Sequence, residues 1–345
     1  DVDLADEYRE AAWRSFTTVP VEPQPGDPTG ANGETYSRHS ALLPLVLAPL
    51  YRLAGPFGAQ LGMLAFAAAA ATAGLAAARS RFPGAPRGAL AAWAILDFAP
   101  PLVLYAGQLW VEVPAALLVA LVCWSITHLD RQESGRASST TRGAFVVLAL
   151  SLVALPLLKL RFLALALPLG ALAFARLRSS ANRRRELALL AAATLLALGL
   201  WNNWRYGNPL RMYAGSDLAI FGVPLAAQLR GGFGLFFDAA FGLFALAPIW
   251  LLLVPALHLA LHGDRRQPGQ EAPVRAAEVA AFLPYLLLIG MRREWYGGWS
   301  PPFRYGVVLL PALALLLPPL CAAKRPTLGL RWLGAIVAAL SAALT

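Results

Sequence analysis

Long apolar runs, separated by short clusters of charged residues, dominate this sequence. Residues 61–78 and 187–200, for example, are rich in Ala and Leu. The core of a soluble domain cannot bury many apolar runs of roughly 20 residues, whereas a bilayer accommodates them. Inside lipid, every backbone N–H and C=O must be paired within the protein, so such runs form helices or barrel strands. Neither run alternates with a period of two, which excludes a barrel and predicts an all-α integral membrane protein.

The composition agrees with a membrane protein. Hydrophobic residues make up 58% of the 345 positions and charged residues 14%, whereas soluble domains carry roughly a quarter charged residues. Cys123 and Cys321 both lie inside apolar runs, which excludes a disulfide scaffold or a zinc module. The formal net charge of +10 comes from Arg residues that flank the apolar runs. Membrane lipids, and not nucleic acid, are therefore the expected partners of this charge.

About ten membrane spans are expected from the apolar runs. They lie near residues 58–78, 88–107, 112–128, 143–159, 162–176, 186–203, 239–261, 275–291, 304–322 and 328–345. Residues 41–54 are apolar too, but the run is short and is interrupted by Pro44 and Pro49, which predicts a helix lying at the membrane interface. The expected architecture is a polytopic helical bundle over residues 58–345, preceded by an outer loop with an interfacial helix over residues 1–57.

The basic residues predict how the bundle is oriented. Alternate connections carry clusters of them: Arg79, Arg81 and Arg87; Arg131, Arg136 and Arg142; Arg176, Arg178 and Arg183 to Arg185; Arg265, Arg266 and Arg275; Lys324, Arg325 and Arg331. Connections of this kind stay in the cytoplasm. The remaining ones, which include outer loops near 204–238 and 292–303, are rich in Trp, Tyr, Gly, Pro and carboxylates. A functional site is therefore expected on the outer face.

Carboxylates at two outer positions are candidates for catalysis. The segment Asp1-Val-Asp3-Leu-Ala-Asp6-Glu7-Tyr8 offers Asp3, Asp6 and Glu7 as a general base or as ligands of a divalent ion. The alternative is a solvated loop or a helix start. Glu112 lies between two apolar runs, where a carboxylate is costly near lipid and should face the bundle or a wet cavity. The alternative is an interfacial residue with its carboxylate in water.

Cations on the expected outer side are candidates for phosphate binding, because Arg binds phosphate with two parallel hydrogen bonds. The set comprises Lys159, Arg161, Arg205, Arg211, Arg292, Arg293 and Arg304. For Lys159 and Arg161 the alternative is snorkelling to the interface. His39 is a further candidate, as a metal ligand or a substrate contact, although no partner histidine lies nearby in the sequence. Neither a Walker-type loop nor a dinucleotide-binding glycine pattern occurs in the sequence, so it gives no support to cytoplasmic nucleotide chemistry.

Several sequence blocks, taken in order, resemble those of a known family. They are the acidic opening, Tyr36 to His39 with Leu43 to Tyr51, Gln108-Leu-Trp-Val-Glu112-Val-Pro114, Trp201-Asn-Asn-Trp-Arg-Tyr-Gly207-Asn-Pro209, Leu235 to Pro248, and Trp295-Tyr-Gly-Gly-Trp-Ser-Pro-Pro-Phe-Arg304-Tyr305. The pattern resembles the GT-C superfamily of polyprenyl-phosphate-sugar-dependent membrane glycosyltransferases. It is most similar to the bacterial protein O-mannosyltransferases and aminoarabinose lipid A transferases.

This resemblance implies an inverting glycosyltransferase in a bacterial cytoplasmic membrane, with its active site facing the periplasm. The donor would be a polyprenyl-phosphate-linked sugar and the acceptor a hydroxyl of a glycan, lipid or protein. Asp3, Asp6, Glu7 and Glu112 would be the catalytic carboxylates. The lipid phosphate would be bound by His39, Lys159, Arg161, Arg293, Arg304 and Tyr305. No cofactor is certain, and a divalent metal is compatible with the acidic residues.

Other interpretations of the same sequence stay open. Members of the superfamily place the acidic motif directly after a first span, so we expect a helix before Asp1 and the true base can lie there as well. A lipid or small-molecule transporter or flippase is the main alternative to an enzyme, although no inverted repeat is visible. An O-antigen ligase or polymerase would need a larger late outer loop than 292–303. A structural subunit without chemistry is the last alternative.

Overall fold

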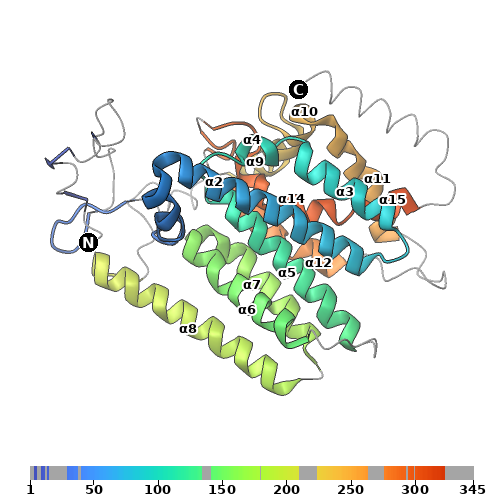
Figure 1. The fold of residues 1–345 in the computed structure, drawn as a ribbon, viewed down its shortest axis with the longest axis horizontal. Helices are drawn as coiled ribbons and strands as arrows, with labels where there is room; N and C mark the ends of the chain where they lie inside the picture. Colours follow the sequence, from blue (N-terminus) through green and yellow to red (C-terminus); the bar gives the residue numbers. More distant parts are fainter. Residues whose placement is uncertain are drawn as a thin grey trace.

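The computed structural model describes residues 4–5, 9–11, 14, 29–37, 40–133, 141–178, 180–209, 224–262, 276–292, 294–298 and 300–322. These residues form helices and turns, with one isolated bridge between Thr29 and Thr35 and no strand among them. The predicted all-helical class is therefore confirmed (Figure 1). Of the described helices, three are long and apolar enough to cross a membrane: Leu42–Arg81, Glu112–Leu129 and Ala181–Tyr206. The larger number of about ten spans stays a prediction.

The first long helix, α2 (Leu42–Arg81), consists of two segments joined at a break. Ala54 and Gly55 have non-helical dihedral angles, and Gly55 has φ of +57°. Pro56 follows directly and has no N–H for the helical hydrogen-bond ladder. The break separates the short run that the sequence predicts as an interfacial helix from the longer run predicted as the first span.

The centre of the bundle is formed by α2 and α5 (Glu112–Glu133), which pack along each other. Small residues on α2, such as Ala67, Ala71 and Ala78, are buried and let the two backbones approach closely. α6 (Thr141–Leu158) packs on α5, and α7 (Leu163–Arg176) packs on α6. In Figure 1 these three helices lie side by side below α2. A short 3₁₀ turn, η2 (Leu160–Phe162), joins α6 to α7.

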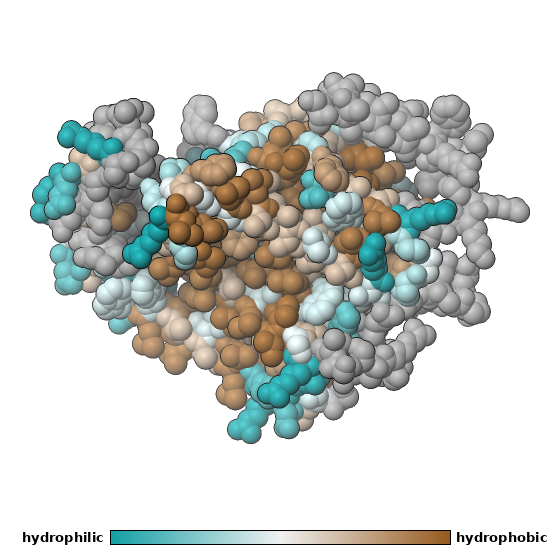
Figure 2. Space-filling model, viewed as in Figure 1, coloured by the Kyte–Doolittle hydropathy of each residue, from teal (hydrophilic) through white to brown (hydrophobic). Residues whose placement is uncertain are grey.

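The helix α8 (Ala181–Tyr206) lies at the edge of the bundle (Figure 1). Only 6% of its most apolar 18-residue window is buried, and Leu196, Leu200 and Trp204 are each at least 60% exposed. It ends at Tyr206 and is followed by Gly207, whose φ of +65° is the left-handed conformation typical of a glycine that follows a helix. Figure 2 shows a broad hydrophobic surface across the middle of the molecule, with hydrophilic residues at its margins. This distribution fits a protein surrounded by lipid.

Four runs predicted as single spans are divided in the structure. Residues 88–107 form α3 (Pro86–Phe98) and α4 (Leu102–Tyr105), and 239–261 form α10 (Leu243–Leu246), η4 (Pro248–Leu252) and α11 (Leu253–His262). Residues 275–291 form α12 (Ala276–Ala280) and α13 (Leu283–Gly290), and 304–322 form η5 (Arg304–Leu309), α14 (Leu310–Ala314) and α15 (Pro318–Ala322). The divisions fall next to prolines, because proline cannot donate to the helical ladder.

A helix also occurs where the sequence predicts an outer loop. Residues 225–237 of the expected 204–238 loop form α9 (Leu225–Phe237). It packs against α13 through Gly231 and Gly290. A Cβ added at Gly231 would lie 2.4 Å from the Gly290 carbonyl oxygen, so the two backbones touch because neither residue has a side chain. The predicted last span, 328–345, lies outside the described residues.

Candidate functional site

Three segments that are far apart in the sequence bring charged side chains together at one end of α5. Glu112 is the first residue of α5, Arg161 lies in η2 and Arg304 is the first residue of η5. Glu112 is fully buried, with 0% of its surface exposed. Its Oε1 accepts a hydrogen bond of 2.5 Å from Arg161 Nη2 and one of 3.1 Å from Arg304 Nε. The carboxylate therefore bridges two guanidinium groups.

Local sequence explains how each side chain reaches this point. A glutamate in the first turn of a helix is favoured by the helix dipole, and Glu112 occupies that turn of α5. Phe303 precedes η5 with φ of +62°, a rare conformation for a residue with a side chain. The buried Phe303 ring packs edge-on against Phe236 of α9, with ring centroids 5.9 Å apart. This anchor fixes the turn from which Arg304 projects.

Aromatic rings surround both guanidinium groups. The Arg304 guanidinium lies 3.5 Å from the centroid of the Trp110 ring, and that of Arg161 lies 4.7 Å from the Tyr305 ring. A cation over an aromatic face is attracted by the ring quadrupole, and more strongly when water is excluded. Tyr285 of α13 donates a hydrogen bond of 2.9 Å to the backbone carbonyl of Tyr305. The rings thus hold the cations in place without neutralising their charge.

The loop before η5 is tied to the same cluster. Arg304 Nη1 donates a hydrogen bond of 3.2 Å to the Gly297 carbonyl, and Ser300 Oγ donates one of 2.9 Å to the same oxygen. Tyr105 of α4 donates from its hydroxyl to the Pro301 carbonyl. Gly297 has φ of +100°, which a residue with a side chain rarely adopts. The shape of the loop and the position of Arg304 therefore depend on each other.

The cluster favours an anionic ligand. Glu112, Arg161 and Arg304 together carry two positive charges and one negative charge. The Arg292 guanidinium lies 5.6 Å from the centroid of the same Tyr305 ring and adds a further cation nearby. Arginine forks bind phosphate or carboxylate with two parallel hydrogen bonds. Glu112 Oε2 has no hydrogen-bond partner among the described residues, so the carboxylate keeps an acceptor for a hydroxyl donor or a water.

The residues predicted from the sequence fall into two groups. The structure brings Glu112, Arg161, Arg304 and Tyr305 together. Lys159 directly precedes η2 and is half-buried. The other group consists of Arg205, which is buried against the rings of Tyr36 and Tyr206 at the end of α8, and of candidates outside the described residues: Asp3, Asp6, Glu7, His39, Arg211 and Arg293. Their roles stay predictions. No group of three or more metal-ligating side chains occurs in the described part of the chain, and the predicted divalent ion depends on acidic residues beyond it.

Tyr285 is a member of the site that the sequence interpretation missed. It lies in an apolar run, and its ring packs against Phe162 with centroids 6.0 Å apart. A single phenol in a predicted span is an ordinary core residue in most membrane helices, so the run alone gives no reason to single it out.

Comparisons of this chain with protein-family models, with curated proteins and with solved structures found no match.

Proposed function

We propose that this protein is an inverting membrane glycosyltransferase that moves a sugar from a polyprenyl phosphate to an acceptor hydroxyl. The observation that carries the proposal is the pairing of Arg161 and Arg304 on one buried carboxylate at the end of the bundle. A transferase of this kind must stabilise the negative charge that develops on the departing lipid phosphate, and preorganised cations do this best. The sequence resemblance supplies the class of donor.

The reaction is a single displacement at the anomeric carbon of the sugar. The acceptor oxygen forms a bond to that carbon while the bond from carbon to the phosphate oxygen breaks, which inverts the anomeric configuration. The hydroxyl proton passes to a carboxylate that acts as general base. The bonding electrons leave with the lipid phosphate, whose oxygens face the guanidinium groups of Arg161 and Arg304 in this proposal.

Glu112 has a positioning role in the proposed reaction. Its carboxylate contacts both guanidinium groups and is fully buried, so it fixes where the two cations point. The general base is then expected in the acidic outer segment that contains Asp3, Asp6 and Glu7. The two carboxylates thus have different roles. Glu112 orients the phosphate-binding arginines, and the general base takes the proton from the acceptor hydroxyl.

The proposal places the protein in a cytoplasmic membrane with this cluster on the outer side. Arg176 ends α7, whereas Arg161 lies just before that helix. Arg79 and Arg81 end α2, where Ser80 forms a hydrogen bond with His128 in the later part of α5, far along that helix from Glu112. Basic connections stay in the cytoplasm, so the cluster would face outward. A lipid-linked donor would enter sideways from the bilayer, where its chain remains solvated by lipid.

Binding of the bare carrier tests the proposal before the sugar is known. Polyprenyl phosphate is the leaving group of every donor in this class, so purified protein in nanodiscs should bind it and should not bind the neutral polyprenol. Arg161→Gln and Arg304→Gln should each weaken binding by about tenfold, roughly 1.4 kcal/mol. Arg230→Gln is the matched control, because it removes the same charge from an exposed position on α9.

Transfer itself is then measured with a panel of radiolabelled polyprenyl-phosphate sugars and a bacterial envelope extract as acceptor. The expected product carries the sugar with inverted anomeric configuration, and the two arginine variants should form it far more slowly. Movement of labelled lipid across liposomes without sugar transfer would instead identify a flippase. Equal binding of polyprenol and polyprenyl phosphate would remove the support that Arg161 and Arg304 give.

A further inference from the structure

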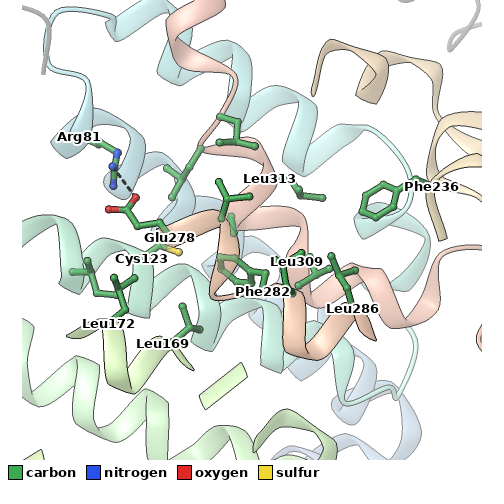
Figure 3. A pocket seen from close by; sticks show the side chains of 16 residues that line it. Arg81, Cys123, Leu169, Leu172, Phe236, Glu278, Phe282, Leu286, Leu309 and Leu313 are labelled. Atoms are coloured by element: carbon green, nitrogen blue, oxygen red, sulfur yellow. Dashed lines mark ion pairs between the residues drawn. The ribbon is translucent and has the colours of Figure 1, made fainter. Parts of the chain in front are cut away.

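The bundle also contains a cavity whose lining includes none of Glu112, Arg161 and Arg304 (Figure 3). It has a volume of about 120 Å³ and lies between α5, α7, α13 and α14. Its walls are almost wholly apolar, with Leu169, Phe236, Phe282, Leu286, Leu309 and Leu313 among them. A dry apolar cavity of ~150 Å³ holds a molecule of the size of benzene. This one therefore accepts a segment of a single hydrocarbon chain.

One end of the cavity is charged. Arg81, from the last turn of α2, pairs with Glu278 of α12 at 2.8 Å, and Glu278 also pairs with Arg176 at 3.0 Å. Figure 3 shows the Arg81–Glu278 pair beside Cys123, at the opposite end from Phe236. Arg81 and Glu278 both line the cavity. Arg81 is the cation that lines the cavity, while Arg176 contacts the other carboxylate oxygen of Glu278. Arg81 is therefore the group that an anion in the cavity would meet.

Arg81 keeps a donor for such a ligand. Its Nε is buried and has no hydrogen-bond partner among the described residues. A buried donor without an acceptor is unfavourable, so an acceptor that enters the cavity is favoured there. The remaining walls offer hydrocarbon contacts but little that could solvate a small free anion. The two halves together fit an amphiphile with an anionic head group and an apolar chain.

We propose that this cavity is a binding site for an anionic membrane lipid, with its head group at Arg81 and one hydrocarbon chain among the leucines. The site is separate from the Glu112 cluster. Cys123 is eleven positions after Glu112 on α5, which corresponds to about 16 Å along the helix. Arg79, Arg81 and Arg87 belong to the basic end of the bundle, so the lipid would come from the leaflet at that end.

Cys123 provides a reporter at the charged end. The sequence has two cysteines, so a Cys321→Ala background leaves Cys123 as the single thiol. The protein is reconstituted in nanodiscs of dioleoyl phosphatidylcholine or of dioleoyl phosphatidylglycerol, and the rate of Cys123 labelling by N-ethylmaleimide is measured. This reagent is neutral, so the surface charge of the bilayer does not change its local concentration. The proposal predicts labelling about tenfold slower in phosphatidylglycerol, as expected for a site about 90% occupied.

Matched variants separate the charge from the cavity. Arg81→Gln should abolish the difference between the two lipids, whereas Arg79→Gln, which removes an exposed charge two positions away on the same helix, should retain it. Arg81→Gln also breaks a buried ion pair and can lower stability. Leu313→Trp therefore serves as a second variant, because it fills the cavity and leaves the ion pairs intact. It should make the two lipids equivalent while the protein remains folded by size-exclusion chromatography.

Several outcomes would overturn the lipid site. Equal labelling rates in the two lipids, or protection that persists in Arg81→Gln or Leu313→Trp, would show that Arg81 and the cavity do not bind the head group and chain. Protection by inorganic phosphate in phosphatidylcholine nanodiscs would show a site for a free anion. Failure of Cys123 to react in either lipid would show that the cavity is closed to small molecules. None of these results bears on sugar transfer at Glu112.

Discussion

Arg304 Nε donates a hydrogen bond of 3.1 Å to Glu112 Oε1, although 192 positions separate the two residues. The contact joins the first turn of α5 to the start of η5, and Glu112 is fully buried in it. It therefore links the packing of the bundle to the position of a cation that the proposed reaction needs. Changes at either residue should affect both stability and phosphate binding, but to different extents.

Glu112→Gln should lower the stability of the protein although the two side chains have nearly the same shape. The amide keeps one acceptor oxygen but leaves the half-buried Arg161 and Arg304 without their shared counter-ion, and breaking a buried ion pair costs about 3–5 kcal/mol. We expect a clearly lower midpoint of thermal unfolding in detergent. Glu186→Gln, at an exposed position of α8, is the control and should leave the midpoint unchanged. An equal midpoint for Glu112→Gln would mean that the ion pairs contribute no net stability.

Arg304→Lys should lose function while it retains the charge. Lysine lacks the planar fork that lets Arg304 bond Glu112 and the Gly297 carbonyl and lie over Trp110 at once. We expect polyprenyl phosphate to bind roughly tenfold more weakly, with a smaller loss of stability than in Glu112→Gln. Calorimetric titration in nanodiscs measures this, with Arg230→Lys as control. Unchanged affinity would indicate that only the net charge matters.

Gly297→Ala should disturb the site through the backbone. Gly297 has φ of +100°, and an added Cβ would lie 2.7 Å from Ser300 Oγ and 2.9 Å from Arg304 Cβ. The loop must shift, and Arg304 with it, so phosphate affinity should fall several-fold. Gly84→Ala is a suitable control, because a Cβ there meets nothing within 4 Å. The same titration compares the two variants, and equal affinities would contradict the coupling of loop and arginine.

Gly231→Ala should separate α9 from α13, because its Cβ would lie 2.4 Å from the Gly290 carbonyl oxygen. Overpacking of this kind costs about 1–3 kcal/mol, which thermal unfolding would detect. The neighbouring Gly232→Ala offers a sharp comparison, since the nearest atom to its Cβ is 4.0 Å away. That variant should be neutral or slightly more stable, because alanine favours the helix. Similar melting of both variants would contradict close packing of these helices.

Part of the site was predictable because it depends on the cost of charge in an apolar setting. Glu112, Arg161 and Arg304 stand out as charged residues beside apolar runs, and a charge in such a place must find a partner or water. The pattern does not say which partner. Arg81 and Arg176, which the sequence interpretation assigned to membrane topology alone, also form buried ion pairs with Glu278.

The sequence by itself determined that the protein is helical and suited to a membrane. The length and spacing of apolar runs are local properties, and they decide whether a helix is stable in a bilayer. The apolar runs 41–54 and 58–78, which the sequence separates, also lie on either side of the break at Ala54 and Gly55 in α2. Only the tertiary structure decided that Glu112, Arg161 and Arg304 meet, and that an apolar cavity ends at Arg81. Both depend on which helices pack together, and that is set by close contacts such as Gly231 against Gly290, which hydropathy does not encode.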